Sequence, residues 1–340
     1  MYCKNIIVIC FILIAFTSFV SARIWIVDNN VNGAGDFTTL AAAHGTAANG
    51  DTIYVYPSVT PYAGITLTKQ LYIIGSGFDL DLHGGQATTT AATIGSQMNF
   101  NPGSEGSLLE GFDGSFNVYI LANNITIKRN DLNWIGIQAS SCRILQNEII
   151  MMNGSFGECI WLKSGFGDHL IANNKLFHSV NGTNKDGIKL EFPYQVTATF
   201  INNVIKTTNG GAMAFRDLSS SCIAINNIII QGGVSGSGVF QYNMANGSQL
   251  PPGVGNIGNI NMTTVFEDPN DFESGLHLRP GSPAIGAGQN GIDMGIYGGD
   301  APYIDGGAPG IPAVFSIDAE VVGGPGNDLQ VNFQAKSNAK

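Results

Sequence analysis

Between residues 119 and 230 the chain returns five times to the same arrangement of apolar and amide positions. The five segments read YILANNITI, CRILQNEII, HLIANNKLF, ATFINNVIK and CIAINNIII. In each, two adjacent amides stand between apolar residues, and the second amides are Asn124, Asn147, Asn174, Asn203 and Asn227. Their intervals of 23, 27, 29 and 24 residues fall in the range of solenoids, propellers and repeat arrays. The pattern therefore predicts stacked structural repeats.

A second short strand is predicted in each unit from the alternation of apolar and polar residues. In the unit at Cys159, Ile160 and Leu162 would face the interior and Trp161 would face outward. Helical periodicity is absent across the region, and glycine-rich corners separate the short strands. These features are typical of a parallel β-helix. The predicted second strands cover residues 136–140, 159–163, 187–191, 212–216 and 239–243.

The recurring asparagines suit the corners of such a coil. Asparagine tolerates the left-handed backbone of a sharp bend better than most residues that carry a side chain. Its amide can also hydrogen bond to an amide in the next coil, as Asn ladders do in other stacked sheets. We therefore interpret the five second amides as a structural ladder, and not as a ligand site.

The composition is rich in glycine and poor in charge. Glycine supplies 45 of the 340 residues, and the charged residues together supply 12%. A helical globule would carry more Glu, Lys and Ala, so this composition favours short strands and turns. The formal net charge is −10, and no stripe of Lys and Arg is present. An acidic surface repels phosphate backbones, which argues against nucleic acid as a partner.

The first 22 residues have the features of a secretory signal. A short start with Lys4 precedes an apolar run from Ile6 to Phe16, and small residues follow before Arg23. The run is shorter than the ~20 residues that a membrane-spanning helix needs, and no later segment is apolar for long enough. We expect a signal peptide cleaved after Ala22, a secreted or cell-surface protein, and no transmembrane segment.

Three cysteines remain after this cleavage, and we expect all of them to be free. An odd number argues against a disulfide framework in an exported protein. Cys142 and Cys222 occupy the same repeat position three units apart. At strand spacing their Cα atoms would lie ~14 Å apart, beyond the ~7 Å limit for a bridge. The third thiol is Cys159.

The coil pattern resembles the right-handed parallel β-helix proteins of the pectate-lyase-like superfamily. The stretch from Gly35 to Gly77 looks like the first coil of such proteins, where a short capping helix precedes a Gly-Asp-Thr-Ile strand. The segment from Leu276 to Gly299, with Ser-Pro-Ala-Ile followed by Asp-Met-Gly-Ile-Tyr, resembles the closing segment of secreted bacterial β-helix proteins. The hand of the coil is implied by this resemblance alone.

The predicted fold is therefore an all-β, right-handed parallel β-helix with two short additions. Residues 23–299 form the β-helix, capped at its start by a short helix within residues 37–48. Residues 300–340 form a Gly/Pro-rich linker and a small pair of strands.

The catalytic motifs of this superfamily are not intact here. A polygalacturonase-type hydrolase is matched only at residues 184–190, and its paired Asp, Gly-His-Gly and Arg-Ile-Lys segments have no counterpart. The lyase Arg-x-Pro-x-x-Arg segment, the Asp cluster that would bind calcium, and the esterase motifs are also missing. We expect no cofactor, with calcium left open. The catalytic candidates are Asp186, which aligns with Glu158, and Lys189, Glu191 and Arg216.

The outward side of the second strand offers a candidate binding surface. An aromatic ring beside amides and charges suits a sugar, particularly an acidic sugar held by Arg. The alternative is an ordinary solvated strand face that carries an exposed Trp. The first predicted outward column holds Gln138, Trp161, Lys189, Ala214 and Gln241, and the second holds Ser140, Lys163, Glu191, Arg216 and Asn243.

Three functions remain open from the sequence. The first is polysaccharide binding by a monomer through Gln138, Trp161, Lys163, Lys189, Glu191, Arg216 and Gln241. The second is a lyase or hydrolase acting on acidic glycans at the same face. The third is a structural or adhesive rod. His169 has no second His near it by repeat position, so we expect it to pack at a corner and to bind no metal.

Overall fold

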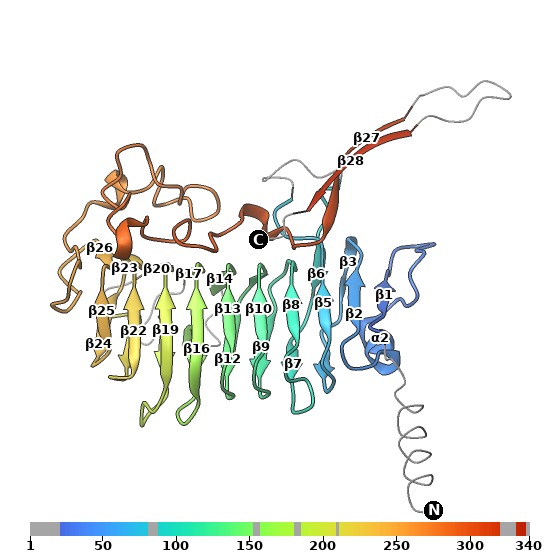
Figure 1. Cartoon of the computed structure of the whole chain (residues 1–340), viewed down its shortest axis with the longest axis horizontal. Helices are drawn as coiled ribbons and strands as arrows, with labels where there is room; N and C mark the ends of the chain where they lie inside the picture. The colour runs from blue at the N-terminus through green and yellow to red at the C-terminus, as the bar shows by residue number, and fades with distance from the viewer. Residues whose placement is uncertain are drawn as a thin grey trace, which may run out of the picture.

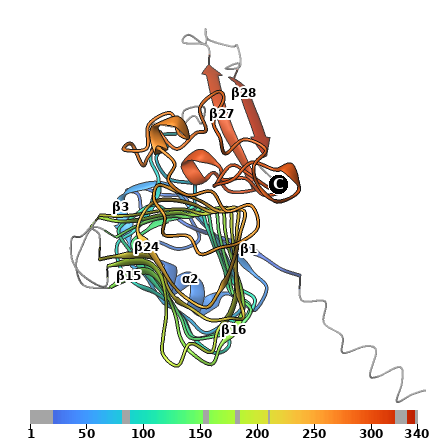
Figure 2. The same cartoon turned by 90° about the vertical axis from the view of Figure 1, so that its left-hand side faces the viewer.

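The computed structural model describes residues 21–80, 88–151, 157–179, 185–208, 211–319 and 331–337. Most of the predicted signal peptide, residues 1–20, lies outside these described residues. Three long parallel sheets run side by side along the molecule (Figure 1). Viewed down the axis on which the coils stack, the three sheets enclose one interior (Figure 2).

The first sheet has ten strands and holds one strand from nearly every coil. Its neighbours pair in parallel, so each strand follows its neighbour by one turn of the chain. The strands are β1 (Ile24–Val27), β2 (Thr52–Val55), β5 (Tyr72–Ile74), β8 (Leu108–Glu110), β10 (Thr126–Lys128), β13 (Arg143–Leu145), β16 (Gly167–Ala172), β19 (Thr197–Ile201), β22 (Cys222–Ile225) and β25 (Val239–Gln241).

The second and third sheets have eight and six strands. The eight-stranded sheet holds β4 (Thr66–Leu67), β7 (Met98–Phe100), β9 (Asn117–Ile120), β12 (Trp134–Ile137), β15 (Glu158–Leu162), β18 (Asp186–Leu190), β21 (Met213–Leu218) and β24 (Gly233–Gly236). The six-stranded sheet holds β11 (Asp131–Leu132), β14 (Glu148–Met151), β17 (Lys175–His178), β20 (Val204–Thr207), β23 (Ile228–Gln231) and β26 (Met244–Ala245).

The chain visits the three sheets in turn, which makes the fold a right-handed parallel β-helix, the hand that parallel crossover connections take. Inward rows of apolar side chains stack from coil to coil, as in the row Ile144, Ile171 and Phe200. All three are fully buried. The predicted fold class is confirmed. Cys142, Cys159 and Cys222 are free and buried, as expected.

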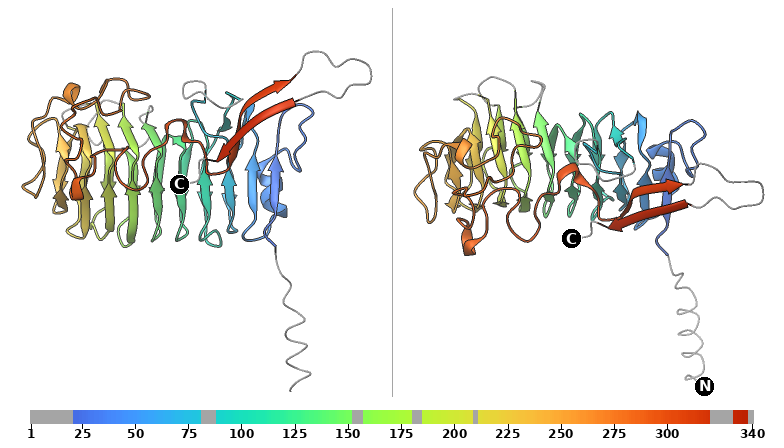
Figure 3. Two further views of the ribbon diagram at one scale, coloured as in Figure 1. Left: turned by 45° about the horizontal axis from the view of Figure 1, so that its top comes forward. Right: turned by 90° about the horizontal axis from the view of Figure 1, so that it is seen from above.

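The ends of the β-helix carry the remaining elements. Helix α2 (Leu40–Thr46) begins after Thr39, whose hydroxyl accepts from the Ala42 amide, and it buries Leu40 and Ala43 against the first coils. The predicted capping helix is confirmed (Figure 2). The other elements are the pair β3 (Ser58–Tyr62) and β6 (Ala92–Ile94), the 3₁₀ turns η1 (Met262–Thr264), η2 (Gln289–Gly291) and η3 (Asp305–Gly307), and the antiparallel hairpin β27 (Pro312–Ala319) and β28 (Val331–Ser337), which projects from the body in Figure 3.

A ladder of buried asparagines joins successive coils where the ten-stranded sheet bends into the six-stranded sheet. In each step the lower amide N–H donates to the Oδ1 of the Asn above at 2.9–3.1 Å among Asn130, Asn147 and Asn174. The ladder holds four of the five predicted residues, and its members are Asn130, Asn147, Asn174, Asn203, Asn227, Asn243 and Asn256.

The prediction for Asn124 is wrong. Asn124 is exposed and lies at the bend between β9 and β10, which is a different corner of the coil. The register of β10 and β13 pairs Lys128 with Leu145, so Asn130 is the residue that stacks on Asn147. A coil has several corners, and a local Asn-Asn pair looks alike at each of them.

The left-handed backbone belongs to the residue before the ladder asparagine and not to the ladder residue itself. At these preceding positions φ lies between 54° and 57° from Arg129 to Asn226. Their side chains hold residues 288–308, here called the C-terminal strap, which runs back along the coils (Figure 3). The contacts are Arg129 with Ala308, Gln146 with Ala301, Asn173 with Ile296, Asn202 with Gly295 and Asn226 with Gln289.

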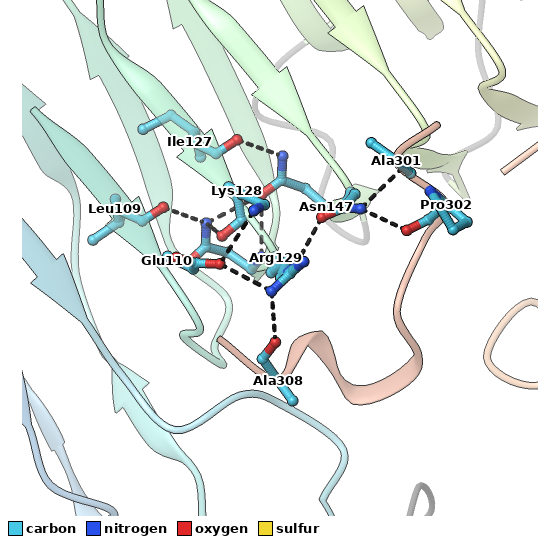
Figure 4. A network of polar contacts seen from close by, with 11 residues as sticks. Leu109, Glu110, Ile127, Lys128, Arg129, Asn147, Ala301, Pro302 and Ala308 are labelled. Carbon is cyan, nitrogen blue, oxygen red and sulfur yellow. Dashed lines mark hydrogen bonds and ion pairs between the residues drawn. The ribbon is translucent and has the colours of Figure 1, made fainter. Parts of the chain in front are cut away.

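The strap and the segment before it cover the outer side of the six-stranded sheet. Val204 and Ile228 are fully buried beneath this cover, and Met294 and Ile296 of the strap pack in the same cluster. At the far end of the strap the fully buried Arg129 contacts Glu110 at 3.3 Å and the Ala308 carbonyl at 3.0 Å (Figure 4). Within the described residues, no helix is long and apolar enough to span a membrane.

Candidate functional site

The eight-stranded sheet keeps an outer face that carries aromatic and charged side chains. Its register places five positions in one row across adjacent coils. A row of this kind repeats at the strand spacing of ~4.8 Å, so neighbouring side chains touch. The row is Tyr119, Gly136, Trp161, Lys189 and Arg216.

Gly136 leaves a slot in this row, and the ring of Trp134 fills it. A Cβ atom at Gly136 would lie 2.1 Å from Cη2 of Trp134, which shows that the ring covers the glycine. The ring also stacks on Tyr119, with centroids 5.8 Å apart and planes 14° from parallel. Trp161 follows Gly136 in the row and is partly buried against the core. Three aromatic residues therefore lie on three adjacent strands.

Glu158 stands beside these rings at the start of β15. Its carboxylate is almost buried and lies 3.8 Å from Nζ of Lys189 on the next coil. Burial raises the pKa of Glu158, while Lys189 and a hydrogen bond from Trp134 oppose the rise. The negative charge of neighbouring Asp186 adds to the rise. Glu158 is thus a carboxyl group that can hold a proton at a higher pH than an ordinary glutamate.

Asp186 lies directly above Glu158 in the sheet but has a different environment. Its carboxylate is fully buried, accepts from the Met213 amide at 2.9 Å, and forms a two-point ion pair with Arg216. The hydrogen bond from Arg216 to Asp186 is the main reason that the pKa of Arg216 is raised. Both carboxylate oxygens of Asp186 are buried and already accept hydrogen bonds, so neither is available to a ligand.

The remaining predicted residues lie at the edge of the same face. Nζ of Lys163 donates to Oε1 of Gln138 at 2.9 Å. Glu191 follows β18 and is close enough to Tyr119 for its charge to add to the rise in the pKa of that phenol, of which burial is the main cause. Next to Glu191 along the chain, Phe192 is 76% exposed and contacts the ring of Tyr194 edge-on at 5.4 Å.

The structure brings Gln138, Trp161, Lys163, Lys189, Glu191 and Arg216 to one face but changes their order. Gln138 neighbours Lys163 instead of Trp161, and Arg216 neighbours Lys189 instead of Glu191. Gln241 lies in the ten-stranded sheet, so its assignment to this face is wrong. The predicted outward positions Ala214 and Asn243 are buried, Asn243 in the asparagine ladder.

Sequence reasoning missed three residues of this face, namely Tyr119, Trp134 and Glu158. Tyr119 begins the first of the five amide segments in the sequence, but its strand β9 belongs to the eight-stranded sheet. The available signal was Gly136, because a glycine inside a strand marks a close approach by another group. That group is Trp134, two residues earlier in the same strand.

Replacing Gly136 by alanine is expected to displace Trp134 and destabilise the protein by about 1–3 kcal/mol, the usual cost of overpacking. Near-ultraviolet circular dichroism would report the lost Tyr119–Trp134 stack, and urea denaturation would report the free energy. Gly45→Ala is the matched control, because nothing lies within 4 Å of the added methyl group. An unchanged spectrum for Gly136→Ala would contradict the described packing.

Metal binding receives no support from the described residues. Among them, no group of three or more His, Cys, Asp or Glu side chains is arranged to hold an ion. The described side chains of this face offer aromatic rings, a Glu158–Lys189 ion pair and a carboxyl group with a raised pKa.

Comparison with known proteins leaves the function to be argued from these residues. No family model matches the sequence, and no curated protein matches it. Among solved structures, the chain is similar to the crystal structure of pectate lyase Pel9A, with 14% identity and a TM-score of 0.44. The match covers 82% of this chain and 97% of that one.

Proposed function

We propose that the protein is exported and binds a polysaccharide across the outer face of the eight-stranded sheet. The observation that carries this proposal is the pair of half-buried aromatic residues Tyr119 and Trp161 in one outward row, with the buried ring of Trp134 filling the slot between them, next to the Glu158–Lys189 pair. Aromatic rings offer flat apolar surfaces on which the apolar side of a sugar ring can pack. Charged groups and amides beside them can bind the hydroxyl or carboxylate groups of the same sugar.

An extended glycan suits this face better than a compact ligand. The row from Tyr119 to Arg216 crosses five strands, and at ~4.8 Å per coil it is ~19 Å long. Lys163 and Lys189 supply positive charge on a chain whose net charge is −10, which favours a glycan that carries carboxylates.

Catalysis by the same face is the second candidate function, and one observation favours it. Glu158 has a raised pKa, which is the property of a general acid, and it lies beside the glycan-binding rings. Asp186 cannot act as its partner at the sugar, because it is fully buried and paired with Arg216. A lyase or hydrolase would therefore need a second group from the exposed residues, such as Lys189 or Glu191.

Affinity electrophoresis against a panel of acidic and neutral polysaccharides tests the binding proposal. We expect retardation by at least one acidic polysaccharide, and loss of that retardation in Trp161→Ala. Tyr72→Ala is the matched control, because Tyr72 is an exposed aromatic residue of the ten-stranded sheet. Retardation that survives Trp161→Ala, or that Tyr72→Ala removes, would contradict the assignment of this face.

The same panel separates the three functions. Release of unsaturated products or reducing ends, abolished in Glu158→Gln while retardation persists, would identify an enzyme. Retardation without any product would identify a binding protein. If no glycan gives either product or retardation, a structural rod is the function that remains.

A further inference from the structure

A small polar pocket lies at the bend between the eight-stranded and ten-stranded sheets, away from the aromatic face. Its volume is about 260 Å³. That is below the range of drug-sized ligand pockets, which begins near ~300 Å³, so the pocket suits a small group. The residues that line it are Asn124, Ser141, Arg143, Asp168, His169, Leu170 and Thr199.

Parallel register builds this pocket from four successive coils, of which Asn124 belongs to the first. Arg143, Leu170 and Thr199 are neighbours in one outward row of β13, β16 and β19. The pairing of β16 with β19 is irregular between Gly167 and His169, and Asp168 lies at that irregularity with φ of 63°. Bulges of this kind re-aim side chains next to functional sites.

His169 presents an unused hydrogen-bond donor to the pocket. The residue is 3% exposed, and its Nδ1 accepts from the Cys142 amide at 3.4 Å. Burial lowers the pKa of His169 to about 4, so the ring is neutral at neutral pH and carries its proton on Nε2. Among the described residues, this N–H has no hydrogen-bond partner.

Arg143 presents an unused cation to the same pocket. The other four arginines of the chain each have a side-chain partner: Asp36 for Arg23, Glu110 for Arg129, Asp186 for Arg216 and the Thr263 carbonyl for Arg279. Arg143 is exposed, and within the described part of the chain its guanidinium forms no ion pair or hydrogen bond.

We propose that this pocket binds an oxyanion through the Arg143 guanidinium and the Nε2–H of His169. The oxyanion is a sulfate, phosphate or carboxylate group, whose oxygens accept several N–H bonds at once. The Asn124 amide and the Thr199 hydroxyl line the same pocket and can donate to the remaining oxygens. The proposal does not depend on polysaccharide binding at the aromatic face.

Asp168 is the one acidic group that lines this pocket. Its Oδ2 accepts from the Ser141 hydroxyl at 3.0 Å, so one oxygen is already engaged. Its charge opposes an incoming anion, and the pocket therefore holds its ligand less tightly than the donors alone would. Asp168→Asn is expected to bind the anion more tightly.

Calorimetric titration with sodium sulfate, sodium phosphate and sodium acetate at constant ionic strength tests the proposal. We expect saturable binding of at least one anion, weakened about tenfold or more in Arg143→Gln, since a hydrogen bond to a charged group contributes about 1.5–3 kcal/mol. Arg23→Gln removes an exposed arginine elsewhere and should change the affinity less than about twofold. Both arginines are exposed, so neither change threatens folding.

The proposal would be overturned if none of the three anions bound saturably, or if Arg143→Gln bound them as tightly as the unaltered protein. Retention of a sulfated polysaccharide above its desulfated form, lost in Arg143→Gln, would support it and identify a glycan substituent as the ligand. Binding of the inorganic anions without that discrimination would support it and identify a free anion.

Discussion

Replacing Asn174 by leucine is expected to lower the free energy of unfolding by about 4 kcal/mol. Oδ1 of Asn174 accepts from the amide N–H and the side chain of Asn147, and Nδ2 donates to the Ile144 carbonyl and to Asn203. Leucine has a similar size but removes these four buried hydrogen bonds, at about 1–3 kcal/mol each before relaxation. The Asn147 side chain keeps its bond to the Ile127 carbonyl, and Oδ1 of Asn203 keeps its bond from the backbone N–H of residue 174.

Equilibrium denaturation in urea measures this loss. Asn124→Gly is the control, because Asn124 is exposed, belongs to no ladder, and has a left-handed backbone that glycine adopts without strain. We expect that variant to lie within about 1 kcal/mol of the unaltered protein. A loss below about 1 kcal/mol for Asn174→Leu would mean that the ladder marks the corner without stabilising it.

The ladder also shows what the sequence could and could not predict about the fold. Repeated amides between apolar pairs predicted stacked repeats, and the short alternating strands with glycine-rich corners predicted that these repeats form a parallel β-helix. They could not show which corner each amide occupies. Asn124 and Asn174 have nearly identical neighbours, and they lie at different bends.

The same limit applies to the outer face of the eight-stranded sheet. Side chains in a strand alternate with a period of two, so a slip of two residues keeps every inward residue inward. The hydrophobic pattern therefore identified the outward residues and could not fix which of them are neighbours. The slip placed Gln138 beside Trp161, where the structure has Gly136, and so hid the slot that Trp134 fills.

Long-range docking was a further feature that local patterns could not predict. The residues that precede the ladder asparagines, from Arg129 to Asn226, contact the C-terminal strap from 63 to 179 positions away in the chain. Periodicity explains why an amide stands at that position in four coils. Periodicity does not identify the partner, because the strap has no repeat of its own and offers backbone amides and carbonyls to these side chains.

Arg216→Met is expected to destabilise the protein by about 3–5 kcal/mol, because it leaves the carboxylate of Asp186 buried without a counterion. Asp186 is fully buried, and the other hydrogen bond to its carboxylate from the described residues comes from the Met213 amide. The double change Arg216→Met with Asp186→Leu removes both charges, and we expect it to recover most of that stability. Lys163→Met is the control, since among the described residues the ammonium group of Lys163 bonds only to the neutral amide of Gln138, and this substitution should cost less than about 1 kcal/mol.

This comparison decides the role of Arg216 on the proposed glycan face. If the double variant regains stability and still binds the polysaccharide, Arg216 is a structural residue that closes the end of the row. The cations that contact the glycan are then Lys163 and Lys189, whose ammonium groups remain partly exposed. If stability returns and binding does not, Arg216 contacts the ligand despite its bond to Asp186. A stable Arg216→Met variant would instead show that Asp186 carries no charge in its buried position, because only a neutral carboxyl group could lose its cation at so little cost.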